Sequence, residues 1–492
     1  MKLKVSFVNA LVSGAVSGGV LAYSSAWLLL TVMQMLLLWQ LSQSANRSRA
    51  PVFVFLYGLG FVLSANFWLG LAIYHPPVNS LVAACLLSGG VLLLHALSYM
   101  LISMALRLVV PACLISGTLG LGFGMAVVWT ASEIVRSLGV WAMPWGLMGY
   151  AHLENPLLTG LYPVIGAHGV AGASWVLAAL LLQVMTIFQQ LETTAKVRFR
   201  RASMAACIIF GAALMPQIDW TQASGPALAV RLVHTDLPGQ EKYTPAAQEF
   251  SLGQLRSVAA QRDADLSVFP ELYVVQNPGD IAQAFRREVV AAVRSGQGAL
   301  VFGTPSEFAL PGAELSRYNT LVQIKPDGET RMYSKQILLP FSEYLPRSPA
   351  LAWAYPYLYH YPQADLTPGD GQDRPFEVKG VRLGVTICSE LAYAGKASRQ
   401  ASGAGLLVNA SSDSWVPSRG YLAQAHLIAR VRAAEAQKPM VRANNVGVSA
   451  FIDERGGVLS AATGGGTTGV MAMQPRSGTT PYVAFAARMA SW

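Results

Sequence analysis

The chain has 492 residues, 53% of them hydrophobic, and its mean hydropathy of +0.40 is too high for an ordinary soluble protein. Its net charge of +9 comes mostly from residues 1–216, which hold 10 Lys and Arg against 3 Asp and Glu, whereas residues 217–492 hold 25 against 23. Because the second part is nearly neutral, this charge does not indicate a nucleic-acid partner. We predict a transmembrane domain over 1–216 and an extracytoplasmic domain over 217–492.

The first domain consists of apolar segments, and a span of the bilayer takes roughly 20 such residues. Lys- and Arg-rich loops remain in the cytoplasm. With the N-terminus inside, nine basic residues fall on the cytoplasmic side and only Arg136 falls on the other. The odd number of spans then places residues 217–492 outside the cytoplasm. We predict seven spans, the last of them short, near 5–22, 25–42, 52–74, 80–104, 109–133, 160–188 and 203–216.

Aromatic residues gather in the loop between the fifth and sixth predicted spans. Trp141, Trp145 and Tyr150 stand at the expected outer interface, where amphipathic rings favour the depth of the lipid headgroups. An ordinary aromatic belt is the alternative interpretation. Arg136 on the same side could meet a lipid phosphate.

The second domain begins near residues 215–227, where continuous hydrophobicity gives way to alternating apolar runs and turn signals. This mixture predicts sheets that are covered by helices. The predicted strands are 227–235, 265–271, 299–305, 381–388 and 405–411, the predicted helices are 244–262, 280–296 and 422–436, and the predicted hairpins are 319–335 and 446–463.

Cys388 ends one of these strands and is followed at once by Ser389 and Glu390. It has no evident disulfide partner, and a lone thiol beside acids in a globular segment is a candidate nucleophile. A buried structural cysteine is the alternative. The other three cysteines lie in apolar stretches of the first domain, where they are small hydrophobic residues: Cys85, Cys113 and Cys207.

Two further polar residues follow short apolar runs, Glu271 in "LSVFPELYV" and Lys335 in "RMYSKQILLP". Attack of a cysteine on a carbonyl group needs a base for the thiol proton and a donor for the developing oxyanion. Glu271 could be the base and Lys335 the donor. The alternatives are a surface carboxylate and a solvated lysine.

The segments "FPE", "KQILLPFSEYLP" and "GVTICSE" together resemble the nitrilase, or carbon–nitrogen hydrolase, superfamily. That superfamily carries a Glu–Lys–Cys triad on an αββα sandwich. With a multi-span segment in front, most of the chain resembles the apolipoprotein N-acyltransferase family. The resemblance implies that Glu271 is the general base, that Lys335 stabilises the oxyanion and that Cys388 carries the acyl chain. It implies that Glu343 is a further essential acid.

The resemblance also implies a membrane N-acyltransferase of the bacterial inner membrane, with its catalytic domain on the periplasmic side. The acyl donor would be a phospholipid and the acceptor the N-terminal amine of a diacylglyceryl-apolipoprotein. We expect a monomer that needs no cofactor. A metal site is not expected, because the histidines and cysteines are dispersed.

The sequence departs from the family pattern near the expected substrate site. The family usually has tyrosine at Ser389, tryptophan at Tyr243 and asparagine at Ser412. It also generally carries a last membrane span, for which "YVAFAARMASW" is too short. The alternatives are therefore a divergent paralogue of conjugal-transfer systems that takes a different amine or amide, and a catalytically silent membrane component. The candidate substrate-binding residues are Tyr243, Ser389, Glu390, Trp415 and Trp145.

Overall fold

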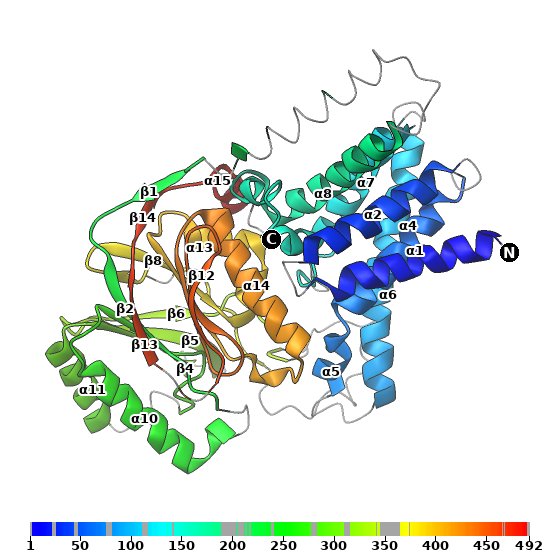
Figure 1. Ribbon diagram of the computed structural model, residues 1–492. Coiled ribbons are helices and arrows are strands. Elements are labelled where there is room, and N and C mark those ends of the chain that lie inside the picture. The colour runs from blue at the N-terminus through cyan, green and yellow to red at the C-terminus, as the bar shows by residue number, and fades with distance from the viewer. Residues whose placement is uncertain are drawn as a thin grey trace. The chain divides into compact units, whose positions relative to one another are not determined.

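The chain forms two compact units, Met1–Asp219 and Trp220–Trp492 (Figure 1). The structure is a computed structural model. It describes residues 2–489 apart from 22–25, 44–47, 75–80, 111–116, 140–141, 188–202, 204–210, 212–213, 216–217, 238–240, 277–282, 309–314, 341, 345–364, 373, 465 and 467.

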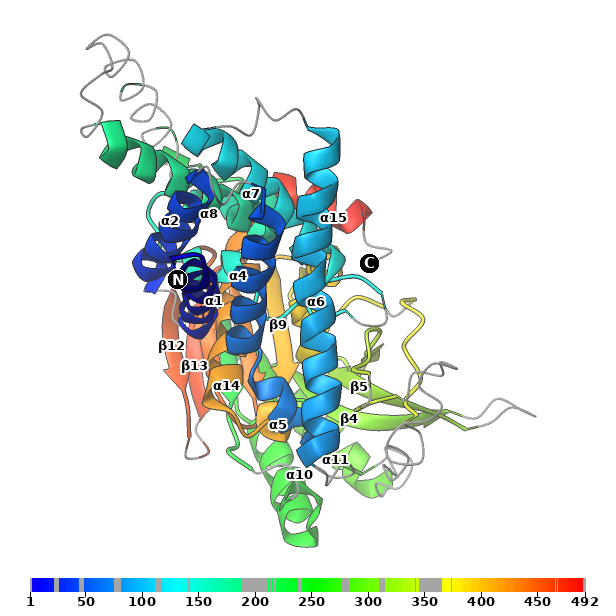
Figure 2. The ribbon, with the colours of Figure 1, turned by 90° about the vertical axis from the view of Figure 1, so that its right-hand side faces the viewer.

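The first unit is helical, and its helices lie at six of the seven predicted spans. Close packing of α1 on α4 depends on glycine, because a Cβ added at Gly14 would lie 2.0 Å from the backbone oxygen of Tyr57. Helices α1, α4 and α6 lie side by side (Figure 2). The helices are α1 (Lys2–Gly19), α2 (Trp27–Ser42), α4 (Ala50–Ala65), α5 (Trp68–Tyr74), α6 (Leu81–Val109), α7 (Gly117–Val135) and α8 (Tyr162–Ile187).

Three helical segments of the described residues are long and apolar enough to cross a membrane: Ala84–Val109, Gly117–Val135 and Thr159–Thr186. The pair α4 and α5, bent by 51°, makes a fourth if it is counted as one span, and α2 is apolar but shorter. Most of the seventh predicted span, 203–216, lies outside the described residues. The count of seven and the orientation that rests on it therefore stay predictions.

The second unit contains two six-stranded sheets and a small two-stranded one. The first sheet has the order β13-β2-β3-β4-β5-β6, and β2, β3 and β4 are parallel. The second has the order β12-β11-β10-β9-β8-β7, and β8, β9 and β10 are parallel. The strands are β1 (Thr221–Ala223), β2 (Leu228–Val233), β3 (Leu266–Val268), β4 (Ala299–Phe308), β5 (Ser316–Ile324), β6 (Thr330–Ser334), β7 (Glu377–Val378), β8 (Val381–Ile387), β9 (Leu406–Ser411), β10 (Met440–Asn444), β11 (Ser449–Ile452), β12 (Val458–Ala462), β13 (Thr468–Met473) and β14 (Arg476–Gly478).

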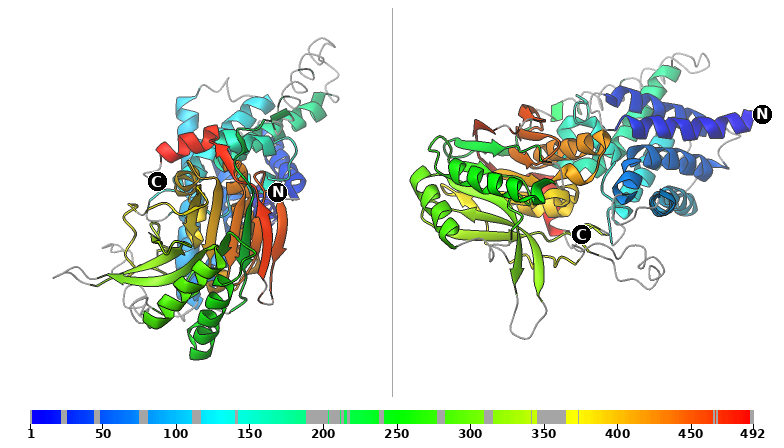
Figure 3. Two further views of the ribbon diagram at one scale, coloured as in Figure 1. Left: turned by 90° about the vertical axis from the view of Figure 1, so that its left-hand side faces the viewer. Right: turned by 90° about the horizontal axis from the view of Figure 1, so that it is seen from below.

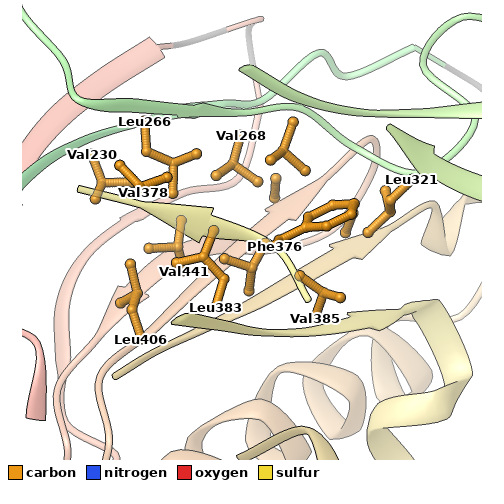
Figure 4. Packing of buried hydrophobic residues seen from close by; sticks show 14 of the residues in the cluster. Val230, Leu266, Val268, Leu321, Phe376, Val378, Leu383, Val385, Leu406 and Val441 are labelled. Atoms are coloured by element: carbon orange, nitrogen blue, oxygen red, sulfur yellow. The ribbon is translucent and has the colours of Figure 1, made fainter. Parts of the chain in front are cut away.

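The two large sheets pack face to face around an apolar core. Figure 4 shows Val230, Leu266 and Val268 of the first sheet meeting Leu383 and Val385 of the second. These β-branched and leucine side chains are buried because both faces of each sheet are covered, which is typical of parallel strands. The β4–β5 hairpin projects beyond the other strands (Figure 3).

Helices cover the outer face of each sheet (Figures 1 and 3). Helices α10 (Pro245–Ala259) and α11 (Gln283–Gly296) pack on the first sheet through their apolar faces. Helices α13 (Ala394–Ala401) and α14 (Arg419–Ala436) contact the second, and α15 (Pro481–Arg488) packs against both of them. The predicted fold class, a helical membrane domain with an αββα domain, is confirmed.

Candidate active site

Cys388 lies where β8 ends and a short 3-10 helix, η7 (Cys388–Ala392), begins. Its backbone is left-handed, with φ of 49°, a conformation that costs free energy for a residue with a side chain. Residues held in such strained conformations cluster at functional sites. The thiol is buried at this turn.

Glu271 and Lys335 come from the first sheet. Glu271 follows β3 closely, Lys335 follows β6 directly, and both side chains are buried. The ammonium Nζ of Lys335 lies 3.7 Å from Oε1 of Glu271 and 2.8 Å from Oε1 of Glu343. The structure therefore brings one lysine between two carboxylates, and Cys388 interacts electrostatically with all three groups.

Asn319 is a member of this cluster that the sequence analysis did not identify. It lies on β5, and its Nδ2 donates to Oε1 of Glu271 at 2.7 Å and to Oε1 of Glu343 at 3.3 Å. Its backbone oxygen accepts a hydrogen bond from the backbone NH of Lys335 at 2.8 Å. A polar residue in the apolar run "NTLVQI" was the signal available, since a buried amide needs polar partners.

Burial and neighbouring charges shift the pKa values in the site. Burial raises the pKa of Glu271, and the charge of Lys335 only partly opposes this. Burial alone would lower the pKa of Lys335, but the carboxylates of Glu343 and Glu271 raise it. Burial and the charge of Glu271 raise the pKa of Cys388, against the effect of Lys335. The resting nucleophile is therefore a thiol, which needs a base to become a thiolate.

Lys242 is a second buried cation near these groups. It lies in a short 3-10 helix, η5 (Glu241–Tyr243), after β2, and it interacts electrostatically with Glu271 and Cys388. Its exposed fraction is 9%, whereas that of Tyr243 is 41%. The sequence analysis proposed Tyr243 for substrate binding, which stays a prediction, and did not identify Lys242. The signal for Lys242 was its place after β2, because β2 and β3 are parallel and end at the same edge.

Two family models match the chain. Residues 211–480 match the model described as carbon-nitrogen hydrolase, and residues 13–180 match the apolipoprotein N-acyltransferase N-terminal domain. The chain is 31% identical over 368 residues to the apolipoprotein N-acyltransferase of Nitrosomonas europaea, covering 73% of this chain and 70% of that protein. The chain belongs to the apolipoprotein N-acyltransferase family.

One further curated relative and one solved structure are also similar to this chain. The apolipoprotein N-acyltransferase of Methylococcus capsulatus is 27% identical over 489 residues, which cover 95% of this chain and 91% of that protein. Among solved structures, the NitFhit protein of C. elegans matches 55% of this chain and 64% of its own, with 16% identity and a TM-score of 0.41. The family models and the two curated relatives confirm the predicted family.

Glu390 of this apolipoprotein N-acyltransferase family member was expected to bind substrate, but its carboxylate is enclosed. Oε1 accepts hydrogen bonds from the backbone NH groups of Gln336 and Ile337, at 2.7 and 3.3 Å. Oε2 accepts from the backbone NH of Ile387 at 2.9 Å and from the hydroxyl of Tyr333 at 2.8 Å. The carboxylate thus ties the segment after Lys335 to the end of β8, and the expected contact of Glu390 with substrate stays a prediction.

Ser389 and Trp415 lie in the same unit as the cluster. The hydroxyl of Ser389 is buried and has no hydrogen-bond partner among the described residues. Trp415 is half-buried, with its ring centroid 5.5 Å from that of Tyr421, and its Nε1 likewise has no partner in the part of the chain that the structure describes. Their assignment to substrate binding stays a prediction.

Trp145 lies in the first unit, where its buried ring meets that of Trp68 at 6.0 Å between centroids. Arg136 is also buried and donates to the backbone oxygens of Trp145 and Gly146. The expectation that Arg136 meets a lipid phosphate is therefore wrong, because its guanidinium holds a loop of its own unit. Trp141 lies outside the described residues.

No three side chains of His, Cys, Asp or Glu gather closely enough to hold a metal ion in the described ranges of the chain. The buried groups that surround Cys388 are suited to proton transfer and to stabilising a negative oxygen.

Proposed function

We propose that this protein transfers an acyl chain from a phospholipid to the N-terminal amine of a diacylglyceryl-apolipoprotein through a thioester on Cys388. The observation that carries the proposal is the cluster of Glu271, Lys335 and Glu343 beside a cysteine in a strained turn, in a chain of this family. We further propose that it acts in the inner membrane, with residues 217–492 on the periplasmic side.

In the first half-reaction, the carboxylate of Glu271 takes the thiol proton of Cys388 while the sulfur attacks the ester carbonyl carbon. The carbonyl electron pair moves onto oxygen, where the ammonium of Lys335 stabilises the negative charge. As this intermediate collapses, the ester C–O bond breaks. The departing lysophospholipid oxygen takes the proton from Glu271, and a thioester remains.

In the second half-reaction, the acceptor amine attacks the thioester carbon and Glu271 takes the amine proton. The C–S bond breaks, and the Cys388 sulfur leaves and regains the proton from Glu271. The order is ping-pong, because the lysophospholipid leaves before the acceptor reacts. A base whose pKa is raised by burial suits both transfers, since its protonated form is a competent acid at moderate pH.

The proposal is tested by intact mass spectrometry of the full chain in detergent after incubation with a phosphatidylethanolamine of defined acyl chains. We expect one added acyl mass that hydroxylamine removes and that disappears when a diacylglyceryl peptide with a free amine is added. The peptide should gain the same mass. An absence of any adduct with phosphatidylethanolamine, phosphatidylglycerol and cardiolipin would overturn the proposal.

Substitution of Lys242 by methionine tests the role of the second cation. Because Lys242 lowers the pKa of Glu271, its loss should raise that pKa further. The acidic limb of the acylation rate should move to higher pH by about one unit, with about a tenfold lower rate at the acidic side. The measurement is the rate of thioester formation against pH.

Lys242→Arg keeps the positive charge, so the acidic limb of the acylation rate should lie at the same pH as in the parent protein. Lys438→Met is the matched control, because Lys438 is also a buried lysine but bonds the backbone oxygen of Arg476 at 2.9 Å. An unmoved limb in Lys242→Met would show that Lys242 does not act on the base.

A further inference from the structure

The turn that holds Cys388 is supported from the neighbouring strand β9 by one amide side chain. Asn409 lies opposite Thr386 in the parallel register of β8 and β9. Its Nδ2 donates to Oγ1 of Thr386 at 3.0 Å and to the backbone oxygen of Thr386 at 3.3 Å. The same Nδ2 lies 3.5 Å from the backbone oxygen of Cys388. The amide therefore binds the last part of β8 and the nucleophile's own carbonyl.

Arg442 determines which way this amide faces. It lies opposite Asn409 in the register of β10 and β9, and its Nη1 donates to Oδ1 of Asn409. A guanidinium can only donate, so Oδ1 must face Arg442 and the NH₂ group must face Thr386 and Cys388. Without Arg442 the amide could turn over and present its oxygen to those two carbonyls, which would repel it.

Asp413 completes a buried ion pair with Arg442. Nη2 of Arg442 lies 2.5 Å from Oδ2 of Asp413, and both side chains are 2% exposed. Asp413 also accepts hydrogen bonds from Nδ2 of Asn444 at 2.6 Å and from Oγ of Ser411 at 2.7 Å. Solvent screens such buried charges little. The negative charge of Asp413 therefore disfavours the thiolate of Cys388 and raises the pKa of its thiol.

We propose that Arg442 and Asp413 form a positioning pair that acts on Cys388 through Asn409 and sets the reactivity of its thiol. The inference rests on the proposed function in that Cys388 is the nucleophile. Neither side chain needs to touch the substrate. Arg442 orients the amide and offsets the charge of Asp413, so the pair restrains the turn while limiting the negative potential at the sulfur.

Other charged and titratable groups also act on Cys388, and none of them changes in the test variants. They lie in the segments after β3 and β6, in η5 and in α14: Glu271, Lys335, Glu343, Lys242 and Tyr421.

The test is the rate of alkylation of Cys388 by iodoacetamide across a pH series, followed by mass spectrometry of the peptide that contains it. Arg442→Gln leaves the charge of Asp413 without its partner, so the thiol should react about tenfold more slowly at a given pH. Asp413→Asn removes the negative charge, so the thiol should react about tenfold faster. The double variant loses both charges, and the introduced glutamine amide can still donate to Oδ1 of Asn409, so its rate should return to within about threefold of that of the parent protein.

We expect the alkylation rate to change in opposite directions in the two single variants and to recover in the double variant. A purely structural role would change the rate in the same direction in both single variants. Arg231→Gln is the control, since the partner of this buried arginine, Asp263, is not among the charges that act on Cys388 in the described residues. Shifts of the same sign, or no shift, would overturn the inference. Alkylation needs no acyl donor, so this outcome is separate from a missing acyl adduct, which would overturn the proposed function instead.

Discussion

Replacement of Cys388 by serine is expected to abolish acyl transfer while the protein stays folded. A serine hydroxyl is a much weaker nucleophile than a thiolate, and nothing in a site tuned to a thiol would ionise it. Loss of the nucleophile costs at least about a thousandfold in enzymes of this kind. The measurement is transfer of a labelled acyl chain from phosphatidylethanolamine to a diacylglyceryl peptide, together with the intact mass of the protein.

Two controls accompany this variant. Among the residues that the structure describes, the other free cysteine is Cys85, which lies on α6. Cys85→Ser should leave transfer and the acyl adduct unchanged. The elution volume and thermal midpoint of Cys388→Ser in detergent should stay close to those of the parent. Transfer by Cys388→Ser within about tenfold of the parent rate would exclude the thioester mechanism.

Replacement of Lys335 by methionine is expected to reduce transfer by about a hundredfold to a thousandfold, the loss typical of an oxyanion donor. It should also destabilise the second unit by about 3–5 kcal/mol, because the buried carboxylate of Glu271 and the partly buried carboxylate of Glu343 lose the cation between them. Transfer rate and thermal unfolding would be measured on the same preparation.

The destabilisation in Lys335→Met should depend on pH. Loss of the ammonium raises the folded-state pKa of Glu271 further, so the folded protein binds more protons than the unfolded chain between the two pKa values. Stability is then lost as the pH rises through that interval, and the variant should unfold more readily at about pH 8 than at about pH 5. A destabilisation that does not change with pH would contradict this account.

The double variant Lys335→Met, Glu343→Gln separates the two effects. Removing one carboxylate relieves the unpaired charge, so much of the lost stability should return. Transfer should stay low, because the donor for the oxyanion is still missing. Recovery of transfer together with stability would show that Lys335 only supports the fold.

Glu271, Lys335 and Cys388 could be proposed as site residues from the sequence because each follows a short apolar run and because the segments around them resemble the nitrilase superfamily. The two-part organisation and the αββα class could be predicted for a similar reason, since hydrophobic periodicity and turn residues are local properties of the chain. The spans of the first domain were harder to count. Length and hydropathy do not distinguish a bent pair such as α4 and α5 from a straight helix.

The residues that the sequence analysis missed are those whose roles depend on contacts between distant strands. Asn319 is 48 residues from Glu271, and Arg442 is 33 residues from Asn409, yet each pair is joined by a hydrogen bond. A polar residue in an apolar strand is the only local signal, and it does not indicate which distant strand supplies the partner.

By itself, the sequence determined where apolar and polar segments lie and which residue types end the strands, because these depend on neighbours along the chain. Only the tertiary structure decided which buried polar groups meet. It placed Lys335 between two carboxylates, enclosed Glu390 and aligned Arg442 with Asn409. The physical reason is that a buried charge or amide needs a partner, and the partner is supplied by whichever strand the register brings alongside.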